Sequence, residues 1–149
     1  MKKLFVFIII CFALLCGCSS QRTRSNEVSI IEETYYLQVE DINNNFDYYL
    51  GKTIKVEGVF RAEKNKFKDR MYYSVSRGFV DSCCAPSADI RLGFEVIWEG
   101  DEKYPQNNEW VRAVGVLDYY YDDDDQEYLY LNLTSLNVLD IWGAVYIGR

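Results

Sequence analysis

Residues 53–59 read Thr-Ile-Lys-Val-Glu-Gly-Val, an alternation of apolar and polar side chains. Successive side chains on a strand point to opposite faces, so Ile54 and Val56 would share one face and the charged residues the other. Gly58 interrupts the alternation, which predicts a bulge or a bend. The segment therefore predicts a half-buried strand.

The same two-residue period recurs towards the C-terminus. We expect strands over 71–75, 92–98, 110–117 and 129–133. The run 110–117 is apolar on both faces, which is typical of a central strand. Residues 138–147 are apolar enough to form a final strand or an extended cover.

Two further elements are expected on the N-terminal side of the 53–59 strand. A first short strand is expected over 35–39, and a helix over 42–50, with Asp41 as its N-cap and Gly51 just beyond its C-terminus. Three apolar residues of this helix would face the core at i, i+4 and i+8, namely Ile42, Phe46 and Leu50. Thirteen tyrosines and only two prolines also favour strand elsewhere.

These elements predict a mainly β domain over residues 34–149. The phrase 49–59, Tyr-Leu-Gly-Lys-Thr-Ile-Lys-Val-Glu-Gly-Val, resembles the opening strand of OB-type barrels. In such barrels a glycine lets the first strand bend across both halves. The predicted fold is a small OB-like β-barrel of five to six strands with a short N-terminal helix.

A second resemblance covers roughly residues 39–140. It is carried by Gly51-Lys52 with Val56-Glu57-Gly58, by Ser82-Cys83-Cys84-Ala85, and by Glu109-Trp110-Val111-Arg112 with Gly115. These segments are similar to the extracytoplasmic β domain of a bacterial family of uncharacterised permease accessory subunits. That family commonly has an Ala-Asp soon after the cysteine pair, whereas here Ala88-Asp89 is displaced by Pro86 and Ser87. The resemblance implies an envelope component beside a transporter, with no known activity.

The N-terminus carries a targeting pattern. Two lysines precede an uncharged run over residues 4–16, which is too short to span a bilayer core and fits a signal peptide. The run ends in Leu15-Cys16-Gly17-Cys18, which resembles a bacterial lipoprotein signal. The resemblance implies cleavage between Gly17 and Cys18 and a lipid on the Cys18 thiol. Residues 1–17 would then be the signal peptide and 18–33 a polar, flexible tether.

The lipid would hold the protein on the extracytoplasmic side of a bacterial membrane. Cleavage would leave 132 of the 149 residues, enough for one domain, and would change the formal net charge from −7 to −9 because Lys2 and Lys3 are lost. So acidic a domain repels phosphate backbones, which disfavours a nucleic-acid partner. The expected partners are the membrane and an envelope or membrane protein.

The sequence contains no histidine. Ser-His and Cys-His nucleophile systems and histidine metal sites are therefore excluded. Hydrolysis by a pair of carboxylates stays open, but no pair among the 23 acidic residues stands out. We expect a binding or accessory function rather than an enzyme, with a carboxylate-dependent hydrolase as an alternative.

Cys83 and Cys84 would be the two thiols left in the exported domain. Neighbouring Cα atoms lie about 3.8 Å apart, closer than a disulfide normally allows. In a loop containing Pro86 the thiols could converge with Asp89 on zinc, the single cofactor that the sequence suggests. The ordinary alternative is that they are small buried apolar residues, and a third is redox or intermolecular pairing. A metal- or redox-linked module is therefore a further alternative function.

Tyr119, Tyr120 and Tyr121 precede an acidic loop at Asp122–Asp125. Tyrosine offers apolar area together with a hydroxyl group, so these side chains are candidates for a recognition surface. The alternative is ordinary strand composition.

Overall fold

The computed structural model describes residues 26–64, 70–80, 90–100 and 103–148. The elements follow in the order β1 (Glu27–Ser29), η1 (Glu32–Thr34), α2 (Tyr35–Asn44), α3 (Phe46–Tyr49), β2 (Thr53–Lys64), β3 (Met71–Val80), β4 (Arg91–Ile97), β5 (Trp110–Tyr121), β6 (Glu127–Val138) and β7 (Tyr146–Gly148).

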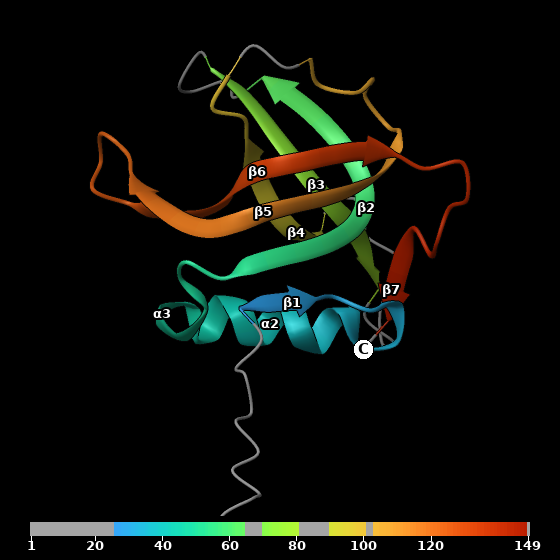
Figure 1. The fold of residues 1–149 in the computed structure, drawn as a ribbon, viewed down its shortest axis with the longest axis horizontal. Helices are drawn as coiled ribbons and strands as arrows, with labels where there is room; N and C mark the ends of the chain where they lie inside the picture. Colours follow the sequence, from blue (N-terminus) through green and yellow to red (C-terminus); the bar gives the residue numbers. More distant parts are fainter. Residues whose placement is uncertain (1–25, 65–69, 81–89, 101–102, 149) are drawn as a thin grey trace, which may run out of the picture.

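Five strands form a closed ring in the order β2, β3, β4, β6, β5 and back to β2. Every pairing in the ring is antiparallel except that of β4 with β6. This is the five-stranded Greek-key barrel of the OB type, and it confirms the predicted fold class. The short strands β1 and β7 add to the ring in parallel, beside β2 and β3 (Figure 1).

The first strand of the ring takes part in both halves of the barrel. β2 pairs with β5 up to Val59 and with β3 from Val59 onward. Gly58 lies at this crossover, where a Cβ atom would come within 2.9 Å of the Ser76 carbonyl oxygen. Figure 1 shows β2 curving strongly along its length. Of the two predicted alternatives, Gly58 is therefore at a bend rather than at a bulge. A bulge-like shift of register occurs in the pairing of β5 with β6, between Val114 and Gly115.

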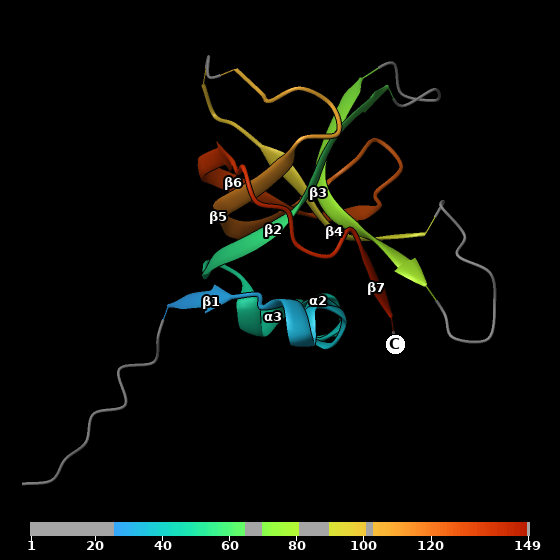
Figure 2. The same ribbon diagram turned by 90° about the vertical axis from the view of Figure 1, so that its right-hand side faces the viewer.

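The predicted strand over 35–39 is wrong, because these residues begin α2. Tyr35, Val39 and Ile42 lie at helical spacing on one face and are all buried in the core. Packing of this face outweighs the strand preference of the tyrosines. Figures 1 and 2 show α2, α3 and β1 together at one end of the barrel.

The predicted helix over 42–50 is present only in two parts. Asp41 lies inside α2 rather than at an N-cap, and Asn45 leaves the helical region at φ −125° and ψ 35°. The Asn45 side chain instead donates to the Asp41 carboxylate at 2.7 Å. Asparagine is a poor helix former, and the non-helical backbone angles of Asn45 separate α2 from α3. Gly51 ends the helical region at φ +74°, as predicted.

The C-terminal segment is mostly a cover rather than a strand. β6 ends at Val138 and β7 begins at Tyr146. Between them, Trp142 stacks on the buried Trp110 with ring centroids 5.9 Å apart, and Leu139 N–H donates to the Trp110 carbonyl at 2.9 Å. In the part of the chain that the structure describes, no helix has the length and apolar character needed to cross a bilayer.

Candidate recognition surface on the β5–β6 hairpin

The β5–β6 hairpin extends past its neighbours in the barrel. β5 pairs with β2 up to Val116, and β6 pairs with β4 over Tyr130–Asn132. β5 and β6 continue to pair with each other out to Tyr121 and Glu127. Figure 1 shows this end of the hairpin reaching beyond the ring. Residues 118–121 and 127–129 therefore form an arm, called the hairpin arm below.

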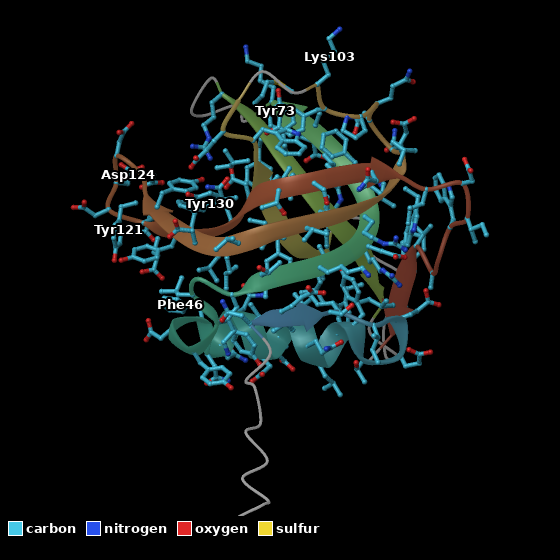
Figure 3. All side chains as sticks on the ribbon, in the orientation of Figure 1. Phe46, Tyr73, Lys103, Tyr121, Asp124 and Tyr130 are labelled. Carbon is cyan, nitrogen blue, oxygen red and sulfur yellow. The ribbon has the colours of Figure 1, made fainter. Side chains whose placement is uncertain are left out.

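An acidic loop closes the hairpin arm. The Asp122 carboxylate accepts backbone hydrogen bonds from Asp124 at 2.9 Å and from Gln126 at 3.0 Å. Asp125 adopts a positive φ of 56°, which the aspartate side chain tolerates in a turn. Figure 3 shows Asp124 and Tyr121 at the outer end and Tyr130 closer to the barrel. The loop gathers several carboxylates at one tip.

One face of the hairpin arm continues the face that is buried inside the barrel. Leu117 is a core residue, and Tyr119 and Tyr121 follow on the same side of the strand. Both tyrosines are exposed, and their rings meet edge to face at 5.6 Å between centroids. The Tyr121 hydroxyl donates to Glu127 at 3.1 Å. The arm thus presents aromatic area outside the core.

The opposite face carries a stack of rings around Tyr120. Its ring stacks on that of Tyr128 at 5.5 Å and contacts that of Tyr130 at 5.8 Å. The Tyr120 hydroxyl donates to the Glu95 carboxylate at 2.7 Å. Burial and this contact with Glu95 raise the pKa of Tyr120. Tyr120 therefore links the hairpin arm to the wall of the barrel.

Glu95 lies on β4 between two core residues, Phe94 and Val96, so its carboxylate is on the outer face of the barrel. Its side chain is nevertheless only 4% exposed. Arg70 Nη2 donates to Glu95 Oε1 at 2.7 Å and also to the Tyr120 hydroxyl. Burial raises the pKa of Glu95, against the opposing effects of the Tyr120 hydrogen bond and the Arg70 charge. We call Arg70, Glu95, Tyr120 and Tyr128 the Glu95 cluster.

The Glu95 cluster lies where OB-type barrels commonly bind ligands. Those barrels use the face of their second and third strands together with the first-to-second and fourth-to-fifth strand loops. Glu95 is on the third ring strand, and Arg70 follows the first-to-second connection. Tyr120 and Tyr128 flank the fourth-to-fifth loop.

The three tyrosines predicted as a surface thus separate onto two faces, Tyr119 and Tyr121 on one and Tyr120 on the other. Sequence reasoning missed Arg70 and Glu95. Gly17, Cys18, Cys83, Cys84 and Asp89 lie outside the described residues. Within the described ranges, no group of three or more acidic or cysteine side chains is placed to hold a metal ion.

A groove of about 400 Å³ lies elsewhere, between the start of α2 and β7. Its lining includes Tyr36, Leu37, Tyr146 and Ile147. Tyr146 is 53% exposed, close to the 59% of Tyr121. The groove and the hairpin arm are therefore two distinct surfaces with exposed aromatic rings, and variants of one can serve as controls for the other.

The model of the DUF1980 C-terminal domain family matches residues 17–147. None of the curated proteins matches the sequence at a significant level. Among solved structures, the mitochondrial single-stranded DNA binding protein Rim1 of S. cerevisiae is similar at 13% identity, with a TM-score of 0.35. That similarity covers 58% of this chain and 93% of Rim1.

Proposed function

The chain belongs to the family of the DUF1980 C-terminal domain, and we propose that it is a lipid-anchored protein of the bacterial envelope. In this proposal Cys18 carries the lipid on the extracytoplasmic side of a membrane. The barrel binds a membrane protein, such as a transporter subunit, and catalyses no reaction.

The anchor is supported by the sequence pattern of residues 2–18. A positive start, a short apolar run and a small residue are typical of a signal peptide, and the cysteine that follows makes the pattern resemble a bacterial lipoprotein signal. Two or more acyl chains would hold the protein stably at a membrane, whereas one chain holds only marginally.

The hairpin arm is the single observation that carries the binding proposal. Tyr119 and Tyr121 extend the buried face of β5 beyond the barrel, where aromatic area is exposed. Tyrosine is enriched in protein interfaces because it buries large apolar area at low entropy cost. The carboxylates of the 122–127 tip favour a partner segment of positive charge. A phosphate-rich partner would be repelled.

A non-catalytic role is supported by the chemistry of the chain. The sequence has no histidine. Glu95 is the buried carboxylate among the described residues, and it is engaged by Arg70 and Tyr120. Carboxylate-dependent glycoside hydrolysis needs two carboxyl groups that face a common substrate.

Mass spectrometry of the mature N-terminus tests the anchor. We expect a chain that begins at Cys18 and carries lipid, recovered with membranes. The Cys18→Ser variant should lose the lipid and leave the membrane fraction. A wild-type chain that keeps residues 1–17, or begins at an unmodified Cys18, would contradict the anchor.

A comparison of tyrosine variants tests the binding surface. The Tyr119→Ala/Tyr121→Ala variant should lose a membrane-protein partner that wild type retains in a pull-down from its own solubilised membranes. Tyr146→Ala removes a similarly exposed ring from the groove and should retain it. Loss with Tyr146→Ala and retention with the double variant would place the partner in the groove and refute the proposal.

A further inference from the structure

We propose that Glu95 and Tyr120 form a guanidinium-binding site, which Arg70 fills in the free protein and an arginine of the partner fills in the complex. The inference rests on the proposed function for the source of that second arginine. The binding site itself can be tested with a small guanidinium compound.

The geometry around Arg70 is that of a bound guanidinium. Arg70 Nη2 is 2.7 Å from Glu95 Oε1 and also donates to the Tyr120 hydroxyl. The Arg70 Cζ atom lies 4.9 Å from the centroid of the Tyr120 ring. A carboxylate, a hydroxyl acceptor and an aromatic face thus surround one planar cation.

The burial of Glu95 explains why the site needs a cation. A buried carboxylate without a partner is strongly unfavourable, and burial already raises the pKa of Glu95. Tyr120 supplies a neutral hydrogen bond and no charge. Exchange of one guanidinium for another keeps the ion pair intact, so it avoids the cost of an empty site.

Arg70 is placed so that it can be displaced. It lies outside β3, immediately before Met71, and its side chain is 43% exposed. The exposed ring of Tyr128 stacks on Tyr120 beside the site. An incoming arginine would therefore meet aromatic surface next to the buried carboxylate, and Arg70 could move into solvent without unpairing a strand.

Guanidinium is favoured over ammonium at this site. Both hydrogen bonds of Arg70 come from Nη2, so the preference rests on the contact of the guanidinium plane with the Tyr120 ring, because a planar and weakly hydrated cation stacks well on an aromatic face. An ammonium group is a strongly hydrated point charge and fits that arrangement less well. Arginine in the partner is accordingly expected to contribute more than lysine.

Binding of N-acetyl-arginine amide to Arg70→Ala tests the site. Because Arg70 competes for Glu95 in the wild type, the variant should bind this compound about tenfold more tightly than wild type. N-acetyl-lysine amide should bind more weakly than the arginine compound. Arg70→Ala/Glu95→Gln should lose the gained binding.

Arg112→Ala is the matched control. Arg112 is 41% exposed and pairs with Glu57, whose side chain is more exposed than that of Glu95. Removal of Arg112 should create no arginine-binding site, because exposed ion pairs contribute little binding energy. Arg70→Gln, which keeps a polar side chain but removes the charge, replaces Arg70→Ala if the latter does not fold.

The outcomes separate the inference from the proposed function. Equal binding of the arginine compound by wild type, Arg70→Ala and Arg112→Ala would overturn the site, even if the Tyr119→Ala/Tyr121→Ala variant loses the partner. Tighter binding by Arg70→Ala supports the site. Undiminished partner capture by Glu95→Gln would then refute the use of that site by the partner.

Discussion

The guanidinium of Arg77 lies 4.9 Å from the ring centroid of Trp110, although Arg77 is only 2% exposed. It also lies 4.5 Å from the centroid of Tyr35 and donates to the Glu57 carbonyl at 3.0 Å. Glu32 accepts from Arg77 at 3.2 Å. One buried side chain thus connects η1, α2, β2 and β5.

Arg77→Ala should destabilise the barrel. The change removes a buried cation between two rings and leaves the Glu57 carbonyl without its side-chain donor. We expect a loss of about 3 kcal/mol in the free energy of unfolding, measured by urea denaturation. Arg112→Ala removes a half-exposed partner and should cost less than about 1 kcal/mol. Similar losses in the two variants would contradict the role of Arg77.

Glu32→Gln should alter the acid limb of the stability profile. The Ala144 backbone N–H, followed by Arg77, lowers the pKa of Glu32 below its ordinary 4.5. A lowered folded-state pKa gives stability that is present above the unfolded pKa and is lost as the pH falls through the folded pKa. The stability difference between wild type and Glu32→Gln should therefore shrink below pH 4.5.

Urea denaturation between neutral pH and about pH 3 measures this difference. Glu33→Gln removes a carboxylate from the same turn and controls for net charge. A difference between wild type and Glu32→Gln that stays constant across this range would contradict a stabilising effect of the Glu32 charge.

Gly58→Ala should strain β2 near the point where it changes pairing partner from β5 to β3. The new Cβ would lie 2.9 Å from the Ser76 carbonyl oxygen, and backbone on both strands would have to shift. The expected loss in unfolding free energy is about 1–3 kcal/mol. A Cβ at Gly148 meets nothing within 4 Å, so Gly148→Ala should change stability by less than about 0.5 kcal/mol. Equal effects of the two changes would refute the close-approach explanation.

Most strands of the ring could be predicted because they carry an alternation of apolar and polar residues, whereas the run 110–117 was recognised by apolar residues on both of its faces. Val56 and Val96 face the core as their positions in that alternation require. The segment 35–39 was misassigned because its alternation is weak and its burial depends on packing against the barrel. Tertiary contacts of this kind decide whether a short aromatic segment forms a strand or a helix.

Only the hairpin part of the candidate site could be predicted from the sequence. Tyr119–Tyr121 are contiguous, so the sequence indicated them directly. Arg70 and Glu95 are separated by 25 residues, and so are Glu95 and Tyr120. Glu95 has the sequence pattern of a solvent-facing strand residue, and only the ring order brings its partners over it. No local pattern carries that information.

Photocrosslinking from the hairpin arm in living cells tests the central proposal most directly. A photoreactive phenylalanine analogue in place of Tyr121, in the membrane-anchored protein, should form a crosslink to one membrane protein. The same analogue in place of Tyr146, which has similar exposure in the groove, should not. No crosslink at position 121, or the same product from both positions, would contradict a partner-binding hairpin arm.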